Sequence, residues 1–144
     1  MSDETLFAVQ GDTFIPTALA GSPWHPAMLH GGAPAGLLAY CLEREARLEG
    51  WQPAKLAIDL LRPVPKAPLG VSVSTRRKGN RIVHLEASLF SHDTVIAVAN
   101  CLFIKPQELS LPAFAPRSNI EITPPDDLEA VSFRDILFGS GGSM

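Results

Sequence analysis

The sequence predicts an α+β fold in which one antiparallel sheet curves around a single long, buried helix. Two observations lead to this prediction. Residues 33–42 are almost entirely apolar, so a helix formed there has no polar stripe and must be surrounded by protein. After the helical segment, apolar and polar residues alternate in successive stretches joined by short turns, which is typical of antiparallel strands. A sheet that covers most sides of a helix has to curve around it.

The composition predicts one globular domain with an ordinary core. The chain has 144 residues, of which 46% are hydrophobic and 19% are charged. Its formal net charge of -3 argues against a nucleic-acid-binding protein. Cys41 and Cys101 both lie in apolar runs, which favours reduced thiols and a cytoplasmic location over a disulfide framework. No long apolar stretch follows the acidic start, so we expect neither a secretory signal nor a membrane span.

The segment before the sheet contains the predicted helix. Residues 6–17 alternate loosely around the turn pair Gly11-Asp12 and predict two short strands, or one strand and an extended arm. The next residues, 21–26, contain two prolines and a glycine and are expected to be irregular. We expect the helix over residues 34–48, because Pro34 suits a first helical turn and Gly50 suits the residue that ends a helix.

Alternation predicts four strands after the helix, over residues 55–64, 71–76, 83–89 and 94–104. The last stretch is apolar on both faces, as a central strand should be. Short turn sequences at 78–80 and 91–93 predict antiparallel hairpins. We assign residues 1–105 to this domain. Residues 106–144 are a proline-rich C-terminal extension, in which 128–138 have the pattern of a short amphipathic helix.

The first candidate for chemistry is the turn His30-Gly31-Gly32 at the start of the helix. Free N–H groups at a helix N-terminus point outward with the positive end of the helix dipole behind them. Glycines let a substrate approach this backbone closely, so a carbonyl oxygen held there would be polarised. The alternative is that two glycines simply make a tight turn into a crowded helix. The sequence leaves both interpretations open.

Three segments resemble a known family. Residues 24–39, which read WHPAMLHGGAPAGLLA, resemble the helix start of the acyl-CoA thioesterase II-like group of hotdog proteins. Residues 58–65, IDLLRPVP, resemble the strand of that group that ends in an Arg-Pro turn, and Gly79-Asn80-Arg81 lies at its basic hairpin. The resemblance runs from about Trp24 to Lys105. It implies a hotdog fold and hydrolysis of acyl-CoA, with Gly32 donating its N–H to the oxyanion and Trp24, His30 and Gly31 shaping the site.

The chain departs from the family in its acidic residues. Many hotdog thioesterases with a His-Gly-Gly turn carry an Asp or Glu on the helix where this chain has Ala39. In the thioesterase II-like group two hotdogs are fused, and the acid lies on the second helix, so this domain resembles the first half. Glu43 lies one turn beyond Ala39 on the same face. Asp59, in an otherwise apolar strand, is either a general base with a raised pKa or a solvated residue that pairs with Arg62.

A basic cluster follows in the predicted hairpin, formed by Arg76, Arg77, Lys78 and Arg81. Arginine forks match phosphate oxygens, so the cluster is a candidate for holding the phosphates of CoA. A charged, solvated hairpin is the alternative. His25 and His30 are not spaced with other ligands for a metal site, and we expect no metal and no cofactor, since CoA is part of the substrate.

The leading hypothesis is therefore an acyl-CoA thioesterase that converts a fatty or aromatic acyl-CoA to the free acid and CoA. Asp59 or Glu43 would activate the attacking water. We expect a homodimer or a larger homo-oligomer, because an open curved sheet leaves edge strands to be paired. The alternative favoured by Ala39 is a non-catalytic acyl-CoA-binding subunit. An enoyl-CoA hydratase ranks last, because no acid lies near His25 or His30.

Overall fold

The computed structural model of the chain describes residues 5–46, 49–110, 112, 120 and 121. Within these residues the helices are η1 (Ala18–Ala20), a single 3-10 turn, and α1 (Gly32–Ala46). The strands of the described part are, in chain order, β1 (Phe7–Gln10), β2 (Thr13–Pro16), β3 (Gln52–Leu60), β4 (Leu69–Lys78), β5 (Ile82–Ser91) and β6 (Thr94–Ile104).

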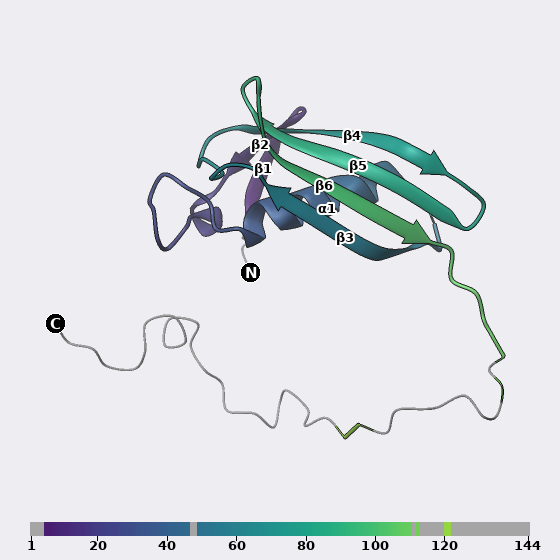
Figure 1. Ribbon diagram of the computed structural model, residues 1–144. Coiled ribbons are helices and arrows are strands. Elements are labelled where there is room, and N and C mark those ends of the chain that lie inside the picture. Colours follow the sequence, from purple (N-terminus) through teal and green to yellow (C-terminus); the bar gives the residue numbers. More distant parts are fainter. Residues whose placement is uncertain (1–4, 47–48, 111, 113–119, 122–144) are drawn as a thin grey trace. The chain divides into compact units, whose positions relative to one another are not determined.

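All six strands form one antiparallel sheet in the order β1-β2-β4-β5-β6-β3. Figure 1 shows α1 lying along the inner side of this sheet, with β3 at one edge and the β1–β2 hairpin at the other. The strand β3 follows α1 directly in the chain but lies beyond β6 in the sheet. The predicted α+β architecture, one buried helix under one curved antiparallel sheet, is confirmed.

The core lies between α1 and the inner face of β5 and β6. Residues of β5 alternate between buried and partly exposed along most of the strand, as a sheet with one covered face requires. The helix contributes six buried residues: Ala33, Pro34, Leu37, Leu38, Cys41 and Leu42. Opposite them, Ala87, Ala97 and Ala99 are at most 1% exposed. Such small side chains let the helix backbone approach the sheet closely.

The predicted elements differ from the observed ones mainly at their ends. The two strands predicted within residues 6–17 form the β1–β2 hairpin, and β6 has the predicted bounds. The strand predicted over 55–64 instead runs from Gln52 to Leu60. It stops there because the N–H groups of Leu61 and Arg62 both donate to the carbonyl of Ile96, at 3.0 and 3.2 Å. The helix predicted over 34–48 begins at Gly32, and its described part ends at Ala46; residues 47 and 48 lie outside the described residues. Gly50, further along the turn, has a φ of 75°.

The described residues up to Glu108 belong to one compact unit. The division at residue 105 stays a prediction, and the helix predicted over 128–138 lies outside the described residues. Within the described part of the chain, no helix is both long and apolar enough to cross a membrane.

Gly70 is the glycine whose replacement the sheet tolerates least. It pairs directly with Phe90 across β4 and β5, and a Cβ atom on Gly70 would overlap the Phe90 ring. The ring therefore uses the space that glycine leaves on this side of the sheet. By contrast, a Cβ atom on Gly36, in the exposed side of α1, would meet nothing within 4 Å.

We predict that Gly70→Ala lowers the free energy of unfolding by about 1–3 kcal/mol, because the methyl group displaces the Phe90 ring. Gly36→Ala is the matched control and should raise it by up to about 1 kcal/mol, since alanine favours helix. Urea unfolding followed by circular dichroism measures both. Equal stability of Gly70→Ala and the unaltered chain would contradict this account.

Candidate functional site

The loop before α1 is held to the rest of the domain by backbone hydrogen bonds. The Leu29 N–H donates to the carbonyl of Val64 at 2.9 Å, and the His30 N–H donates to the carbonyl of Ala20 at 3.2 Å. The Lys66 N–H donates to the carbonyl of Ala27 at 2.8 Å. The segment after the Arg62-Pro63 turn thus fixes the position of the helix start. This structural role accounts for the proline-rich sequence that follows β3.

In the described structure two N–H groups at the start of α1 are open to solvent, those of Gly31, just before the helix, and of Gly32, its first residue. The Ala33 N–H donates to the His30 carbonyl at 3.0 Å, whereas in the described structure the N–H groups of Gly31 and Gly32 reach no backbone acceptor. Both glycines are exposed. Unpaired N–H groups at a helix N-terminus, backed by the helix dipole, form an anion-binding position. This position can accept the oxygen of a polarised carbonyl.

The imidazole of His30 lies directly against Gly32. A Cβ atom on Gly32 would be 3.2 Å from both Nδ1 and Cε1 of His30, so the ring occupies the space beside the glycine. The structure thus brings His30, Gly31 and Gly32 together at one point. Trp24 lies in the same loop, with its side chain largely in solvent at 63% exposure.

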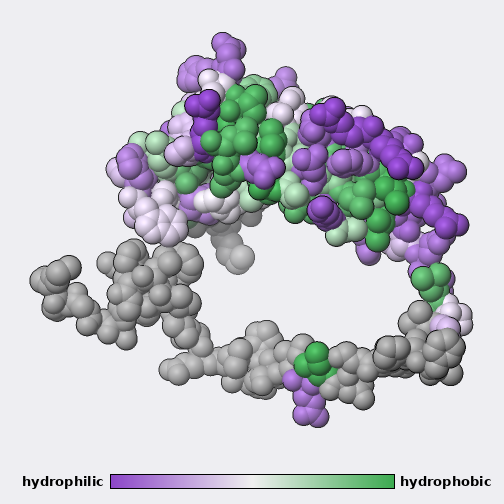
Figure 2. All heavy atoms as spheres, viewed as in Figure 1, coloured by the Kyte–Doolittle hydropathy of each residue, from purple (hydrophilic) through white to green (hydrophobic). Residues whose placement is uncertain are grey.

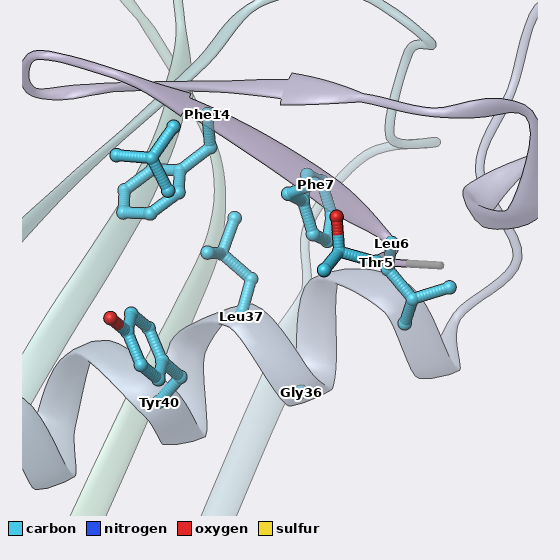
Figure 3. Close-up of a pocket in the computed structure, with 8 residues that line it drawn as sticks. Thr5, Leu6, Phe7, Phe14, Gly36, Leu37 and Tyr40 are labelled. Carbon is cyan, nitrogen blue, oxygen red and sulfur yellow. The ribbon is translucent and has the colours of Figure 1, made fainter. Parts of the chain in front are cut away.

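A cavity of about 520 Å³ lies between the β1–β2 hairpin and α1. In Figure 3, Phe7 and Phe14 project from the hairpin toward the helix, and Leu37 and Tyr40 project from the helix toward the hairpin. Gly36 also lines the cavity and, having no side chain, leaves the helix surface bare at its position. This cavity could not be predicted from the sequence, because its two walls come from separate segments of the chain, the hairpin and the helix.

Neither candidate carboxylate lies at the helix start of its own chain. Asp59 pairs with Val98, whose neighbours Ala97 and Ala99 face the helix, so Asp59 lies on the outer face of the sheet. It is exposed, and within the described residues it forms no ion pair with Arg62. Glu43 lies roughly 16 Å from Gly32 along the helix axis, at 1.5 Å per residue.

The two carboxylates differ in which side of the sheet they occupy. Burial raises the pKa of the Cys101 thiol, and the nearby Glu43 carboxylate raises this pKa further. Glu43 is exposed on α1, and α1 lies along the inner side of the sheet. Glu43 therefore shares the inner side of the sheet with the helix start, whereas Asp59 does not.

The basic cluster lies at the opposite end of the sheet from the helix start. Leu60, the last residue of β3, has its Cδ1 atom near Gly31. The first residue of β3, Gln52, pairs with Ile104, which also pairs with Ile82 beside the β4–β5 turn. The length of β4 sets the two ends roughly 30 Å apart. Figure 2 shows hydrophilic atoms gathered over this hairpin end.

Within the cluster the charges are not equally available. The Arg76 guanidinium forms an ion pair with Glu86 on the neighbouring strand. Arg77 and Arg81 line a shallow hollow of about 260 Å³ together with Gly79, Asn80 and Ile82. No described carboxylate pairs with Arg77 or Arg81. Like Lys78, which also forms no ion pair among the described residues, these two arginines are free to hold an anionic group.

The described residues contain no group of three His, Cys, Asp or Glu side chains placed to share a metal ion. The absence of a metal and of a cofactor stays a prediction. Both cysteines are free and buried, and burial also raises the pKa of the Cys41 thiol. Neutral, buried thiols are poor nucleophiles, so neither cysteine is a candidate catalytic nucleophile.

One exposed apolar feature was missed in the sequence. The edge strand β3 has no buried residue. Leu56 and Leu60, on its inner face, are 41% and 51% exposed, and Leu61 just beyond it is 57% exposed. The alternating pattern of one strand does not determine the order of strands in a sheet. It therefore could not show that β3 lies at an edge of the described sheet.

The family model of the acyl-CoA thioesterase N-terminal domain matches residues 20–104, which is more than half of the chain. A comparison with curated protein sequences found no significant match. Among solved structures, a conserved protein of unknown function with a hot dog fold from Alicyclobacillus acidocaldarius is similar, with a TM-score of 0.64 and 19% identity. That similarity covers 88% of this chain and 47% of the other.

Two further structures have the same fold. A Bacillus halodurans protein crystallised with CoA gives a TM-score of 0.57 at 20% identity, over 64% of each chain. The PaaI protein of the E. coli phenylacetic acid degradation operon gives 0.59 at 17% identity, over 66% of this chain and 70% of its own. The chain thus spans less than two thirds of the Alicyclobacillus and Bacillus proteins. The similarity to these structures shows the hotdog fold, and by the match over residues 20–104 the chain belongs to the family of acyl-CoA thioesterase N-terminal domains.

Proposed function

We propose that the chain is an acyl-CoA thioesterase that hydrolyses a fatty or aromatic acyl-CoA to the free acid and CoA. One observation carries the proposal: the open N–H groups of Gly31 and Gly32 at the start of a buried helix, in a chain of the acyl-CoA thioesterase N-terminal domain family. Water adds to the thioester carbonyl, and the resulting oxyanion accepts a hydrogen bond from the Gly32 N–H. The C–S bond then breaks and releases the CoA thiol.

The proposed active form is a homodimer or a larger homo-oligomer joined through β3. This strand is nine residues long, has no neighbour along one side in the described sheet and exposes Leu56 and Leu60 on its inner face. A long apolar edge strand favours pairing with another copy of itself. The other edge strand, β1, has only four residues. Figure 2 shows hydrophobic atoms over part of the β6–β3 side of the sheet.

Pairing through β3 would also bring the basic hairpin of one copy close to the helix start of the other. Antiparallel pairing of two β3 strands turns one sheet end for end relative to the other. The β4–β5 hairpin of one copy then lies toward the same end as the helix start of the second copy. This arrangement supports a site in which Arg77, Arg81 and Lys78 of one copy hold the CoA phosphates while Gly32 of the other holds the carbonyl. Arg76 has a smaller share, because Glu86 already pairs with it.

The water-activating group is assigned to Glu43 rather than to Asp59. Glu43 is exposed on α1, which lies on the inner side of the sheet. Asp59 lies on the outer face. In its own chain Glu43 is too far from Gly32 to act, so it would serve the site of the second copy. We expect no separate cofactor, because CoA is part of the substrate. The buried free thiols of Cys41 and Cys101 support a reducing, cytoplasmic compartment.

A second function is favoured by Ala39, which occupies the position where related hotdog domains carry an acid. A chain without a working base would bind acyl-CoA without hydrolysing it and would need a different hotdog domain to supply the acid. The two functions share the helix start and the basic hairpin, and they differ only in turnover. The release of free thiol from a panel of acyl-CoAs separates them: turnover by the pure chain supports the esterase, and saturable CoA binding without turnover supports the binding subunit.

We predict that Gly32→Pro lowers kcat by about 10²–10³-fold more than Gly32→Ala does. Proline removes the N–H that receives the oxyanion but is tolerated in a first helical turn, whereas alanine keeps the N–H and adds a comparable Cβ against His30. The measurement is thiol release under saturating acyl-CoA, with circular dichroism to verify folding. Equal activity of the two variants would remove Gly32 from the mechanism.

We predict that Glu43→Gln lowers kcat by at least about 10²-fold, the usual contribution of a general base, while Asp59→Asn changes it little. The amide keeps the size of each side chain and removes its ability to accept a proton. Steady-state thiol release at several pH values measures both. A large loss in Asp59→Asn with none in Glu43→Gln would reverse the assignment.

We predict that Leu56→Lys and Leu60→Lys convert the oligomer to a monomer, because a charge on the inner side of β3 opposes pairing of two β3 strands. Val9→Lys is the control, since Val9 is similarly exposed but lies in β1, at the opposite edge of the sheet from β3. Multi-angle light scattering after size exclusion gives the mass of each. A full-size oligomer in both β3 variants would show that another surface joins the copies.

A further inference from the structure

The cavity between the β1–β2 hairpin and α1 continues the exposed side of the helix that begins at Gly32. Gly32, Gly36 and Tyr40 follow one another at four-residue spacing, and all three are exposed. Gly36 and Tyr40 line the cavity. A group whose carbonyl oxygen rests at the Gly32 N–H therefore enters the cavity one helical turn further along.

The cavity is lined for an uncharged, apolar occupant. Among the described residues that line it, none carries a charge, and only Thr5 and Tyr40 carry polar side-chain atoms. Leu6, Phe7, Phe14 and Leu37 provide the apolar walls. Burial of a carboxylate here would find no cation to compensate it, so acyl groups that end in a carboxylate are excluded.

Hydrogen bonds and strand pairing fix the position of the hairpin that forms one wall of the cavity. The Thr17 hydroxyl donates to the carbonyl of Thr5 at 2.7 Å, and the Thr17 N–H donates to the carbonyl of Leu6 at 3.0 Å. At its other end the hairpin joins the sheet through Thr13 and Phe14, which pair with Gly70 and Leu69. Leu6 and Phe14 are thereby fixed opposite the bare helix surface at Gly36.

We propose that this cavity is the acyl-binding groove of the chain, with Gly36 as the residue that opens it and Tyr40 as the residue that closes its far end. The inference rests on the proposed binding of acyl-CoA at Gly32. From Gly32 to Tyr40 the helix rises about 12 Å. An extended chain advances about 1.2 Å per bond, so the groove takes an unbranched acyl chain of about ten bonds or an aryl group of similar length.

The experiment uses S-alkyl-CoA thioethers of increasing chain length, which bind but cannot be hydrolysed. With the unaltered protein we expect the Kd measured by isothermal titration calorimetry to fall by up to about fourfold per added CH₂, and to level off near ten bonds. Gly36→Leu should abolish this dependence beyond the shortest chains while leaving their Kd unchanged. The variant should fold, because a Cβ atom at Gly36 meets nothing and leucine favours helix.

Ser72→Leu is the matched control, because Ser72 is exposed and pairs with Ser88 in β4 and β5, outside the groove. It should retain the dependence on chain length. Tyr40→Ala should move the plateau to longer chains. A Kd that does not change with chain length in the unaltered protein would overturn the proposal and leave the cavity to another occupant, such as a segment of a second copy.

The test also separates this inference from the proposed function. Thioether binding that depends on chain length and on Gly36, without turnover of any acyl-CoA, would keep the groove and reject hydrolysis. Turnover of acyl-CoA with the same chain-length profile in the unaltered protein and in Gly36→Leu would keep hydrolysis and overturn the groove. Absence of binding by any thioether would overturn both.

Discussion

The packing of α1 against the sheet, above all against β5, determines where every other part of the structure can lie. Ala33 on the helix and Ala87 on β5 are almost fully buried, and α1 packs more closely against β5 than against the other strands. A helix held in this way cannot slide along its axis without placing larger side chains against the sheet. Its first turn is therefore fixed in space, and so are the Gly31 and Gly32 N–H groups.

The same packing explains why the helix has one open side. The sheet covers the inner side of α1, but it leaves uncovered the side that carries Gly32, Gly36 and Tyr40, where the hairpin and the cavity lie. It also stops at β3, whose leucines remain exposed. The described domain thus has a well-packed core, a helix start whose N–H groups are open to solvent, and an edge strand with exposed leucines. The proposed binding at the helix start and the proposed assembly at the β3 edge both use surfaces that the core does not need.

The sequence was a good guide to features that depend on near neighbours in the chain. The apolar segment at 33–42 and the glycines at 31 and 32 predicted the buried helix and its start, because helix burial and helix ends are local patterns. Features that depend on sheet order were not predictable. The Ile96 carbonyl that ends β3, the separation of the basic hairpin from Gly32, and the outward direction of Asp59 all follow from β3 lying beside β6. The cavity was likewise invisible, since its walls meet only in the folded chain.

Gly36 has a consequence for how this domain can change over evolutionary time. No neighbouring atom requires a glycine there, and the middle of a helix is an unfavourable place for one. A stability-driven substitution to alanine is thus always available, yet it would begin to fill the space beside the hairpin. If the cavity holds the acyl group as proposed, substrate range and stability are opposed at this one position. A single replacement there would then shorten the preferred acyl group of a descendant of the chain and make the domain more stable.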